Sequence, residues 1–387
     1  MTQTCKAIIF DMDGVLVDSE PVHIHAHERY FRDMGLTLDP SIIYERFIGS
    51  TSTPLWTTLK EIYHLPQPLE ELIAKGREYE TTQEDIDGFP PIPYIPELLR
   101  DVRSHGLRTA VASSSPLSRI RRTLASLQIE DCFDECVSGT RLAHPKPAPD
   151  TFLAAAEALG VRPEECLVIE DSGNGVRAAV AAGMPCVAFH NPHSGVQDLS
   201  PADVIVESFE EVTADFLLQV YAHHFHLPAR ILKTDRFSLR ELSMSDLPDF
   251  ERLLTEDPQA VLPGAFPEEP TQLQDFLHSY ILHQYPFYGF GLWAAVDGKN
   301  DIIGLYGLHM TEASENLVPE ACWLTVPRLR RQGYALEAMK AICSYAEDSL
   351  GCRGICARIA PDNTASLRLA QRLHMHLTSD GCYLVIF

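Results

Sequence analysis

Short apolar runs recur along the first 220 residues, and stretches with helical periodicity separate them. Short apolar runs bounded by polar turns are typical of fully buried strands. We expect such strands at 8–10, 107–112, 166–169 and 185–189. Helical periodicity lies between them at 96–105, 118–127 and 175–182. Strands that alternate with helices in this order predict an α/β unit built on a parallel sheet.

The segment between the first two expected strands has helical periodicity throughout. Helices are expected there at 22–31, 41–47, 54–63 and 69–82. An all-helical insertion directly after the first strand favours a cap, residues 18–88, over the catalytic end of the sheet. His23, His25 and His27 alternate in the first of these helices. Because only His23 and His27 would share a helix face, we expect contacts with substrate or solvent rather than a metal site.

After residue 235 the pattern changes to alternating strands and separate helices. We expect strands at 237–242, 289–296, 302–309 and 320–326, and helices at 245–254 and 336–349. The turn at 297–301 is a hairpin signal. Pro228 and the polar run after it predict a linker at 226–235. Domains are therefore expected at 1–225, with a core of 1–17 and 89–225, and at 236–387.

Composition narrows the class of protein. The 387 residues carry a formal net charge of −23, so attraction to a nucleic-acid backbone or an anionic membrane is not expected. Residues 1–6 lack a signal-peptide pattern, and no apolar run approaches the roughly 20 residues that cross a bilayer. Ten cysteines are scattered without a CxxC pair, which favours reduced thiols in a cytoplasmic protein.

The first expected strand ends in two aspartates, Asp11 and Asp13, followed by Gly14. Ligands of parallel α/β sheets bind beyond the carboxyl ends of the strands. Two carboxylates at spacing i and i+2 on an extended backbone can converge on one hard cation such as Mg²⁺. One aspartate is then placed as a nucleophile and the other as an acid–base group. Gly14 allows a sharp turn close to a ligand.

Three later segments carry matching chemistry. The strand at 107–112 ends in a serine run that begins with Ser113 and opens a helix, which suits a phosphate. Lys146 lies between prolines and offers one fixed positive charge. The strand at 166–169 ends in Glu170 and Asp171, a second acidic pair. Carboxylates, one cation and one hydroxyl at strand ends are what Mg²⁺-assisted phosphoryl transfer requires.

These four motifs in this order resemble the haloacid dehalogenase (HAD) superfamily over about residues 4–220. The resemblance implies a Rossmann-like core with a helical cap and an aspartyl-phosphate formed on Asp11. It implies that Asp13 is a general acid and base whose backbone carbonyl also faces Mg²⁺. The residues implied to bind phosphate are Ser113 and Lys146, and the implied metal set is Asp11, Asp13, Glu170 and Asp171.

The resemblance leaves two activities open for the first domain. β-Phosphoglucomutases keep a cap arginine and an asparagine after the serine motif to hold a second phosphate. The corresponding stretches here, 48–52 and 115–117, contain neither residue. We therefore favour a phosphatase of a small phosphorylated metabolite, of the sugar-phosphate type. A mutase remains the alternative, and the same departure leaves the substrate open.

The second half contains a basic loop, Arg330-Arg331-Gln332-Gly333-Tyr334-Ala335, that opens an expected helix, and Asn363 before the last helix. Backbone N–H groups at such a helix start can bind an anion. Together these segments resemble the GNAT N-acetyltransferases over about residues 234–387, which implies an α+β domain with a mixed sheet. The residues implied to bind acetyl-CoA are Leu324, Val326, Arg330, Arg331, Gly333, Tyr334, Ala335 and Asn363.

The acceptor side of this second site departs from the family pattern. Ala370 stands where many relatives carry a thiol-protonating tyrosine, and His374 stands where a glycine is usual. Tyr383 or Glu320 could supply an acid or a base. We expect a bifunctional enzyme whose second domain acetylates an amine, either of a small molecule or of a protein N-terminus. A non-catalytic acetyl-CoA sensor that controls the first domain is the other possibility.

Overall fold

The computed structural model describes residues 4–46, 52–88, 90–256, 272–310, 318–379 and 381–387. The chain divides into two compact units, Met1–His224 and Phe225–Phe387, which we describe separately. Among the described residues no helix is both long enough and apolar enough to cross a membrane. All ten cysteines lie in the described part of the chain, and each has a free thiol.

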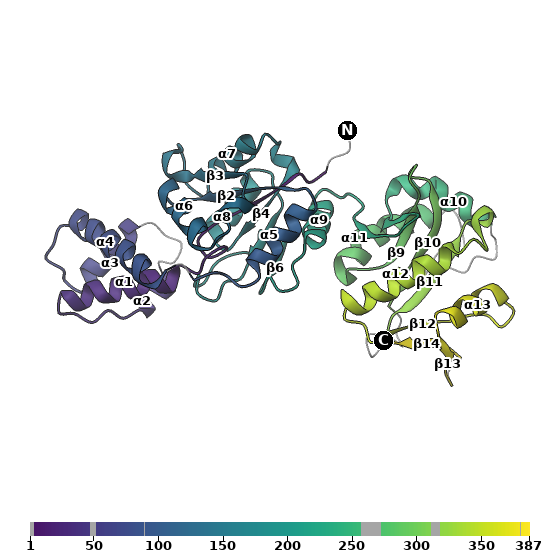
Figure 1. Ribbon diagram of the computed structural model, residues 1–387. Helices are drawn as coiled ribbons and strands as arrows, with labels where there is room; N and C mark the ends of the chain where they lie inside the picture. Colours follow the sequence, from purple (N-terminus) through teal and green to yellow (C-terminus); the bar gives the residue numbers. More distant parts are fainter. Residues whose placement is uncertain (1–3, 47–51, 89, 257–271, 311–317, 380) are drawn as a thin grey trace. The chain divides into compact units, whose positions relative to one another are not determined.

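The first unit is built on a six-stranded parallel sheet with the order β3-β2-β1-β4-β5-β6 (Figure 1). The strands are β1 Ala7–Phe10, β2 Arg108–Ser113, β3 Glu135–Ser138, β4 Cys166–Glu170, β5 Cys186–Phe189 and β6 Val204–Val206. β1 lies at the centre, and Phe10 pairs with Val111 on one side and Ile169 on the other. β1 and β4 are fully buried, as expected for parallel strands covered on both faces.

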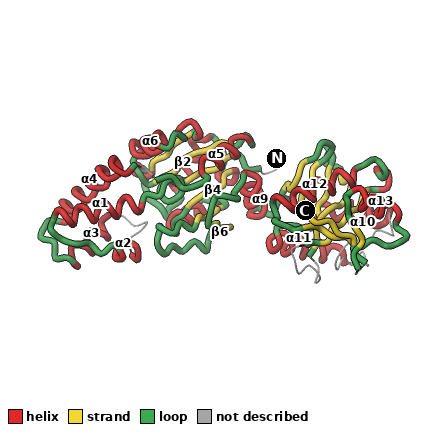
Figure 2. The backbone as a smooth tube through the Cα atoms, turned by 60° about the horizontal axis from the view of Figure 1, so that its bottom comes forward, coloured by secondary structure: helices red, strands yellow, loops and turns green. Residues whose placement is uncertain are grey.

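Helices surround this sheet, so that the strands form an inner layer (Figure 2). They are α5 Ile95–Ser104, α6 Leu117–Ser126, α7 Asp150–Leu159, α8 Gly173–Ala181 and α9 Ala214–His224. α7 packs against β2 and β3, and its buried Phe152 shares one apolar cluster with Ile9 and Val168. The alternation of strand and helix predicted from the sequence is therefore confirmed, and all strand ends that carry the motifs face one edge of the sheet.

Four helices follow β1 and form the cap: α1 Glu20–Asp33, α2 Ser41–Arg46, α3 Ser52–Ile62 and α4 Leu69–Asp87. They have an apolar cluster of their own, in which Trp56 packs edge-on against His27 at a ring distance of 5.3 Å. His23 and His27 both face α4, where they contact Glu84 at 3.3 Å and Glu80 at 3.0 Å. The two histidines thus share a helix face, as their spacing predicts.

The second unit contains an eight-stranded mixed sheet with the order β13-β14-β12-β11-β10-β9-β8-β7. Its strands are β7 Arg230–Lys233, β8 Ser238–Glu241, β9 Leu292–Val296, β10 Ile302–His309, β11 Glu320–Thr325, β12 Gly354–Ala357, β13 His376–Leu377 and β14 Tyr383–Ile386. β11 and β12 run parallel, and the other neighbours are antiparallel. The helices are α10 Leu247–Glu256, α11 Leu273–Tyr288, α12 Tyr334–Asp348 and α13 Thr364–Arg372.

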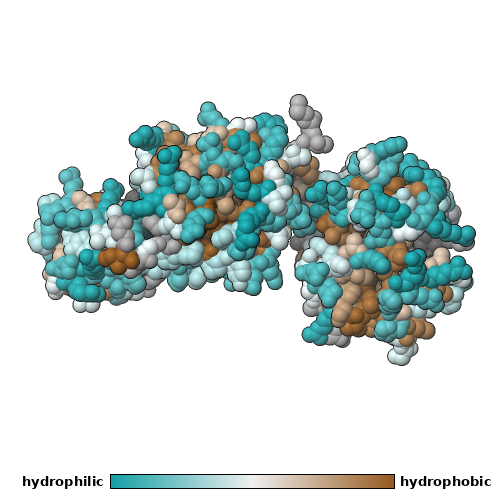
Figure 3. Space-filling model, in the orientation of Figure 1, coloured by the Kyte–Doolittle hydropathy of each residue, from teal (hydrophilic) through white to brown (hydrophobic). Residues whose placement is uncertain are grey.

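The linker expected at 226–235 is not wholly irregular, because β7 lies within it as the edge strand of the second sheet. Four residues are too short for alternation to reveal a strand. The other edge of this sheet exposes apolar side chains, and Figure 3 shows apolar residues gathered near β13 and β14. Leu377 and Ile386 are 61% and 55% exposed there.

Candidate active sites

Three neighbouring strands of the first unit bring their carboxyl ends together. Asp11 follows β1, Ser113 ends β2, and Glu170 ends β4, and β1 lies between the other two strands. The backbone N–H of Asp11 donates to the carbonyl of Ile169 at 2.9 Å, which ties the loop after β1 to β4. The strand order therefore places these predicted site residues side by side, although more than 50 residues separate them along the chain.

Lys146 reaches this strand edge from the loop before α7. Its Nζ contacts Asp11 Oδ1 at 2.5 Å and Glu170 Oε1 at 2.7 Å. A third contact, 3.2 Å long, joins it to the carbonyl of Ala112 at the end of β2. Its ammonium also lies 4.5 Å from the centre of the Phe152 ring. One buried cation thus links the three strand ends, and the neighbouring carboxylates keep its pKa above the ordinary value despite burial.

The Asp11 carboxyl is almost completely buried, with 9% of its side chain exposed. Burial raises its pKa to about 7, because the attraction of Lys146 only partly offsets desolvation and the repulsion of Glu170. Burial also raises the pKa of Asp171 well above its ordinary value, and the negative charges of Glu170 and Asp11 add to this. The site therefore contains more buried negative charge than its single lysine compensates.

Glu170 and Asp171 have different surroundings although they are adjacent. Oε2 of Glu170 accepts hydrogen bonds from the N–H groups of Asp171 and Ser172, both 2.8 Å long, while Oε1 contacts Lys146. Asp171 accepts a hydrogen bond from the hydroxyl of Ser194, in the loop after β5. A Cβ on Gly14 would lie 1.9 Å from Asp171 Oδ2, so only glycine lets this carboxylate lie against the loop that carries Asp11 and Asp13.

The donor set fits Mg²⁺ with few protein ligands. Among the described residues, no three His, Cys, Asp or Glu side chains gather into a ready-made metal group. Mg²⁺ usually takes one or two carboxylates and keeps several waters, so Asp11 and Asp171 with a backbone carbonyl suffice. A divalent cation there would also offset the uncompensated charge of these two carboxylates. Glu170, by contrast, already uses both oxygens on Lys146 and backbone N–H groups, which suits a supporting role.

Asp13 faces the cap side of the loop. Arg119, on α6, donates to both of its carboxylate oxygens, at 2.7 and 2.8 Å, and the hydroxyl of Ser115 donates at 3.0 Å. Burial raises the pKa of Asp13, but the charge and hydrogen bonds of Arg119, together with the charge of His23, outweigh burial and leave the pKa below its ordinary value. Arg119 also contacts Glu84 of α4 at 2.7 Å, so one guanidinium joins the Asp13 loop to the cap.

Sequence reasoning missed Ser115, Arg119, Glu84 and Ser194. Arg119 lies one helical turn after Ser115, so the serine run followed by an arginine at i+4 could have indicated it. No sequence pattern around Glu84 indicates a role in the site, because Glu84 reaches Arg119 only through the packing of α4. Ser113, which was predicted, is 1% exposed and its hydroxyl accepts a hydrogen bond from the N–H of Ser115 at 3.0 Å. This contact orders the serine loop beside Asp11.

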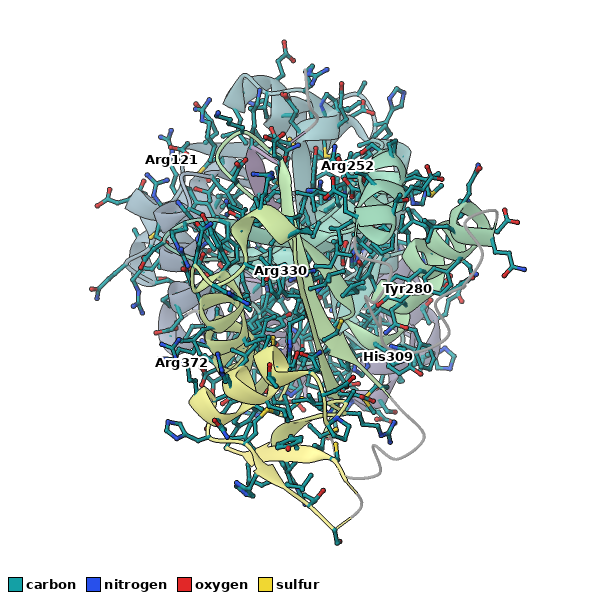
Figure 4. The ribbon with its side chains drawn as sticks, turned by 90° about the vertical axis from the view of Figure 1, so that its right-hand side faces the viewer. Arg121, Arg252, Tyr280, His309, Arg330 and Arg372 are labelled. Carbon is teal, nitrogen blue, oxygen red and sulfur yellow. The ribbon has the colours of Figure 1, made fainter. Side chains whose placement is uncertain are left out.

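The predicted anion loop of the second unit lies between β11 and α12, where Figure 4 labels Arg330. Gly333 is the residue before α12 and has a φ of 85°, and no side chain caps this helix start. Nε of Arg330 donates to the carbonyl of Thr325 at 3.1 Å, which folds the loop back on β11. Arg331 also has a positive φ, of 62°. The backbone at the start of α12 is thus shaped like an anion-binding turn.

Arg236, which sequence reasoning missed, supports this loop. Its guanidinium lies 3.9 Å from the centre of the Tyr334 ring and contacts Glu337 at 2.5 Å. It also donates to the carbonyl of Gln332 at 3.0 Å. Tyr334 therefore helps to position the loop, because the guanidinium of Arg236 stacks on its ring. Ala335 follows it in the first turn of α12 and is partly buried.

The parallel strands β11 and β12 pair where β11 begins, at Glu320 and Cys356. The loop before α12 follows the opposite end of β11. Leu324 and Val326, farther along, are buried at 8% and 6% exposure. Trp323 Nε1 donates to the hydroxyl of Ser366 on α13 at 3.0 Å.

The other predicted residues of this unit have structural partners. The side chain of Asn363 caps α13 by accepting from the N–H of Ser366 at 3.1 Å. Glu320 contacts the guanidinium of Arg358 at 3.3 Å. Tyr383 lies on β14, where it pairs with Ala357 of β12. The acetyl-CoA set and the acid and base of acetyl transfer therefore stay predictions.

Comparison with known proteins matches both halves to families. Residues 5–183 match the haloacid dehalogenase-like hydrolase family. Residues 236–376 match the GNAT acetyltransferase domain. Both resemblances drawn from the motifs, and the α/β fold class with its second mixed-sheet domain, are thereby confirmed.

Similar proteins cover the first unit. The chain is 35% identical over 191 residues to the fructose-1-phosphate phosphatase of Escherichia coli, which covers 48% of this chain and 97% of that protein. It is 31% identical over 209 residues to a phosphorylated carbohydrates phosphatase of Thermotoga maritima, covering 54% and 96%. A β-phosphoglucomutase structure from Clostridium difficile is 24% identical with a TM-score of 0.49, covering 58% and 100%. The chain is therefore an enzyme of the haloacid dehalogenase-like hydrolase family that also carries a GNAT acetyltransferase domain.

Proposed function

We propose that the first unit is a Mg²⁺-dependent phosphatase of a small phosphorylated metabolite, of the sugar-phosphate type. The observation that carries this proposal is the buried ammonium of Lys146, which joins Asp11 to Glu170 where three strands end. Such a cation neutralises a phosphate next to a carboxylate nucleophile. The two relatives named above as phosphatases of fructose 1-phosphate and of phosphorylated carbohydrates support this substrate class.

The proposed reaction has two steps. A carboxylate oxygen of Asp11 attacks phosphorus, the bond to the substrate oxygen breaks, and Asp13 gives the departing alkoxide a proton. This role requires Asp13 to be protonated in the substrate complex, although Arg119 lowers its pKa in the free protein. Asp13 then takes a proton from water as the water attacks the phosphorus of the aspartyl-phosphate, which releases phosphate and restores Asp11. Lys146 and the Ser113 loop hold the phosphate oxygens. Bound Mg²⁺, held by Asp11, Asp171 and the Asp13 carbonyl, would offset the negative charge of phosphate and carboxylates.

For the second unit we propose acetyl-CoA-dependent N-acetylation of an amine on a small molecule or a protein N-terminus. Support comes from the uncapped start of α12, where Gly333 with its positive φ allows the backbone to approach a pyrophosphate. Arg330 and Arg331 add positive charge to the same loop. Leu324 on β11 and Val326 directly after it would line the apolar arm of the cofactor, and Asn363 would contact the cofactor from the start of α13.

The test is phosphate release from phosphorylated sugars, polyols and amino sugars, with and without Mg²⁺. We expect turnover that needs Mg²⁺ and that is lost in Asp11→Asn. Calorimetric titration of the same preparations with acetyl-CoA tests the second unit, and binding should be equal in both proteins. No release from any compound would refute the phosphatase, and turnover that survives in Asp11→Asn would refute the aspartyl-phosphate.

A further inference from the structure

Beyond Asp13, charged side chains of the cap and of α6 form a connected group, which we call the cap-side network. It consists of Glu84 of α4, His23 of α1, and Arg119 and Arg122 of α6. Glu84 is its centre, with only 5% of its side chain exposed. It contacts Arg119 at 2.7 Å, Arg122 at 2.5 Å and His23 at 3.3 Å.

Both guanidiniums of this network already face carboxylates. Arg119, 14% exposed, lies between Asp13 and Glu84. Arg122 also pairs with Glu84. Burial raises the pKa of Glu84, but its hydrogen bond to His23 and the charge of Arg119 outweigh this and keep it ionised. The carboxylate of Glu84, which belongs to the cap, therefore offsets the positive charge of Arg119 beside Asp13.

A second phosphate on the substrate would need such a cation. A mutase returns the phosphoryl group of Asp11 to a molecule that already carries one phosphate, so it must hold a doubly phosphorylated species. A phosphatase that releases phosphate to water has no such requirement. Arg119 contacts both Asp13 and Glu84, and Arg122 contacts Glu84, so Glu84 competes with any anion for both guanidiniums.

We propose that Glu84 is a specificity-determining residue that restricts the first unit to monophosphates whose leaving group carries no second anion. This inference rests on the phosphatase proposed above and deepens it by naming the substrate class. Removal of the Glu84 charge would leave Arg119 and Arg122 available to a second phosphate. The cap would then accept bisphosphates, and the preference that separates a phosphatase from a mutase would weaken.

The test compares fructose 1-phosphate with fructose 1,6-bisphosphate. Binding is measured by calorimetry in the Asp11→Asn background, where the proposed chemistry cannot consume the ligand. We expect the wild-type cap to bind the monophosphate at least tenfold more tightly. Adding Glu84→Gln should improve bisphosphate binding relative to monophosphate by roughly tenfold or more, because one unit charge at a few ångströms acts through a partly buried site.

The matched control is Glu78→Gln, which removes the same charge from the same helix. Glu78 is 63% exposed and pairs with Lys75, away from the network. It should leave the ratio of the two affinities unchanged. A further variant, Glu84→Gln with Arg119→Gln, should lose most of the gained bisphosphate binding. Should Glu84→Gln not fold, Glu84→Asp withdraws the carboxylate while keeping its charge and should give a smaller gain.

The outcomes separate this inference from the proposed function. Tighter binding of the bisphosphate by the wild-type cap, or an unchanged ratio in every folded Glu84 variant, would overturn the role of Glu84 whether or not phosphate is released. Absence of phosphate release in the protein with Asp11 intact would overturn the phosphatase alone. Equal gains from Glu78→Gln and Glu84→Gln would show a general charge effect and would also overturn the inference.

Discussion

A phosphate in the first unit would meet ionised side chains, whereas an anion in the second would mainly meet backbone. At the strand edge, Lys146 lies between Asp11 and Glu170, and all three side chains are at most 9% exposed. At the start of α12, Gly333 turns the chain with a φ of 85°, and Arg236 braces the loop from outside. The first site depends on buried charge, and the second depends on backbone conformation.

This difference predicts different sensitivities. Removing one partner of a buried ion pair strongly destabilises the protein, because the other partner is left charged and desolvated. A backbone site tolerates side-chain changes but not a residue that cannot adopt its φ. Charge substitutions should therefore damage the first site most, and glycine substitutions the second. Four predictions test this contrast, and they are ordered from the largest expected effect to the smallest.

Asp11→Asn should reduce phosphate release by about 10⁴-fold or more, as is typical when a nucleophile is removed. Asparagine has nearly the same shape, so the first unit should keep its fold. Phosphate assays on the best substrate measure the loss, and acetyl-CoA titration of the same sample provides the control. Loss of acetyl-CoA binding along with phosphatase activity would contradict the separation of the two sites.

Lys146→Met should destabilise the first unit by about 3–5 kcal/mol, because Asp11 and Glu170 would face each other without a cation. Denaturant unfolding followed separately for the two units measures this change. Lys75→Met is the matched control, since Lys75 is 49% exposed and its pair with Glu78 should contribute less than about 1 kcal/mol. Similar losses in both variants would mean that burial of the pair is not what matters.

Gly333→Val should weaken acetyl-CoA binding roughly tenfold, since a left-handed conformation costs a side chain about 1–2 kcal/mol. Phosphate release should not change. Gly351→Val is the control: Gly351 also has a positive φ, of 61°, and nothing lies within 4 Å of the added Cβ. If the control weakens acetyl-CoA binding as much, the effect comes from general strain and not from the α12 loop.

Mg²⁺ should stabilise the first unit by a few degrees, and more at pH 8 than at pH 5.5. Without metal the pKa of Asp11 is raised from 3.8 to about 7. The protonated carboxyl therefore contributes stability that is complete below pH 4 and is lost as the pH rises through 7. Mg²⁺ must displace this proton, so its binding strengthens with pH.

Thermal melts at the two pH values, with and without Mg²⁺, measure this linkage. At saturating Mg²⁺ each kcal/mol should correspond to about 2–4 °C for a unit of this size. In Asp11→Asn the pH dependence of the Mg²⁺ effect should shrink. A Mg²⁺ effect that is equal at both pH values in the wild type would exclude Asp11 as the linked group.

Much of the first site could be predicted because each of its motifs is visible within a short stretch of sequence. Asp11, Ser113 and Glu170 each lie where a buried apolar run stops, so the pattern indicates both a strand and its end. The strand β7 could not be predicted in this way, because four residues at a sheet edge leave too short an alternation. Asn363 is predicted at the cofactor from its motif, and what the structure shows is that its side chain caps α13.

The sequence by itself determined the alternation of strands and helices around β1, β2, β4 and β5, the chemistry at the strand ends that carry the motifs, and the two families. These properties depend on neighbours within a few residues, where hydrophobic periodicity and turn geometry act. Only the tertiary structure decided that Arg119 joins Asp13 to Glu84, and that Arg236 braces the α12 loop across about 100 residues. Such contacts are set by how helices pack on sheets, and no local pattern records which side chains then meet.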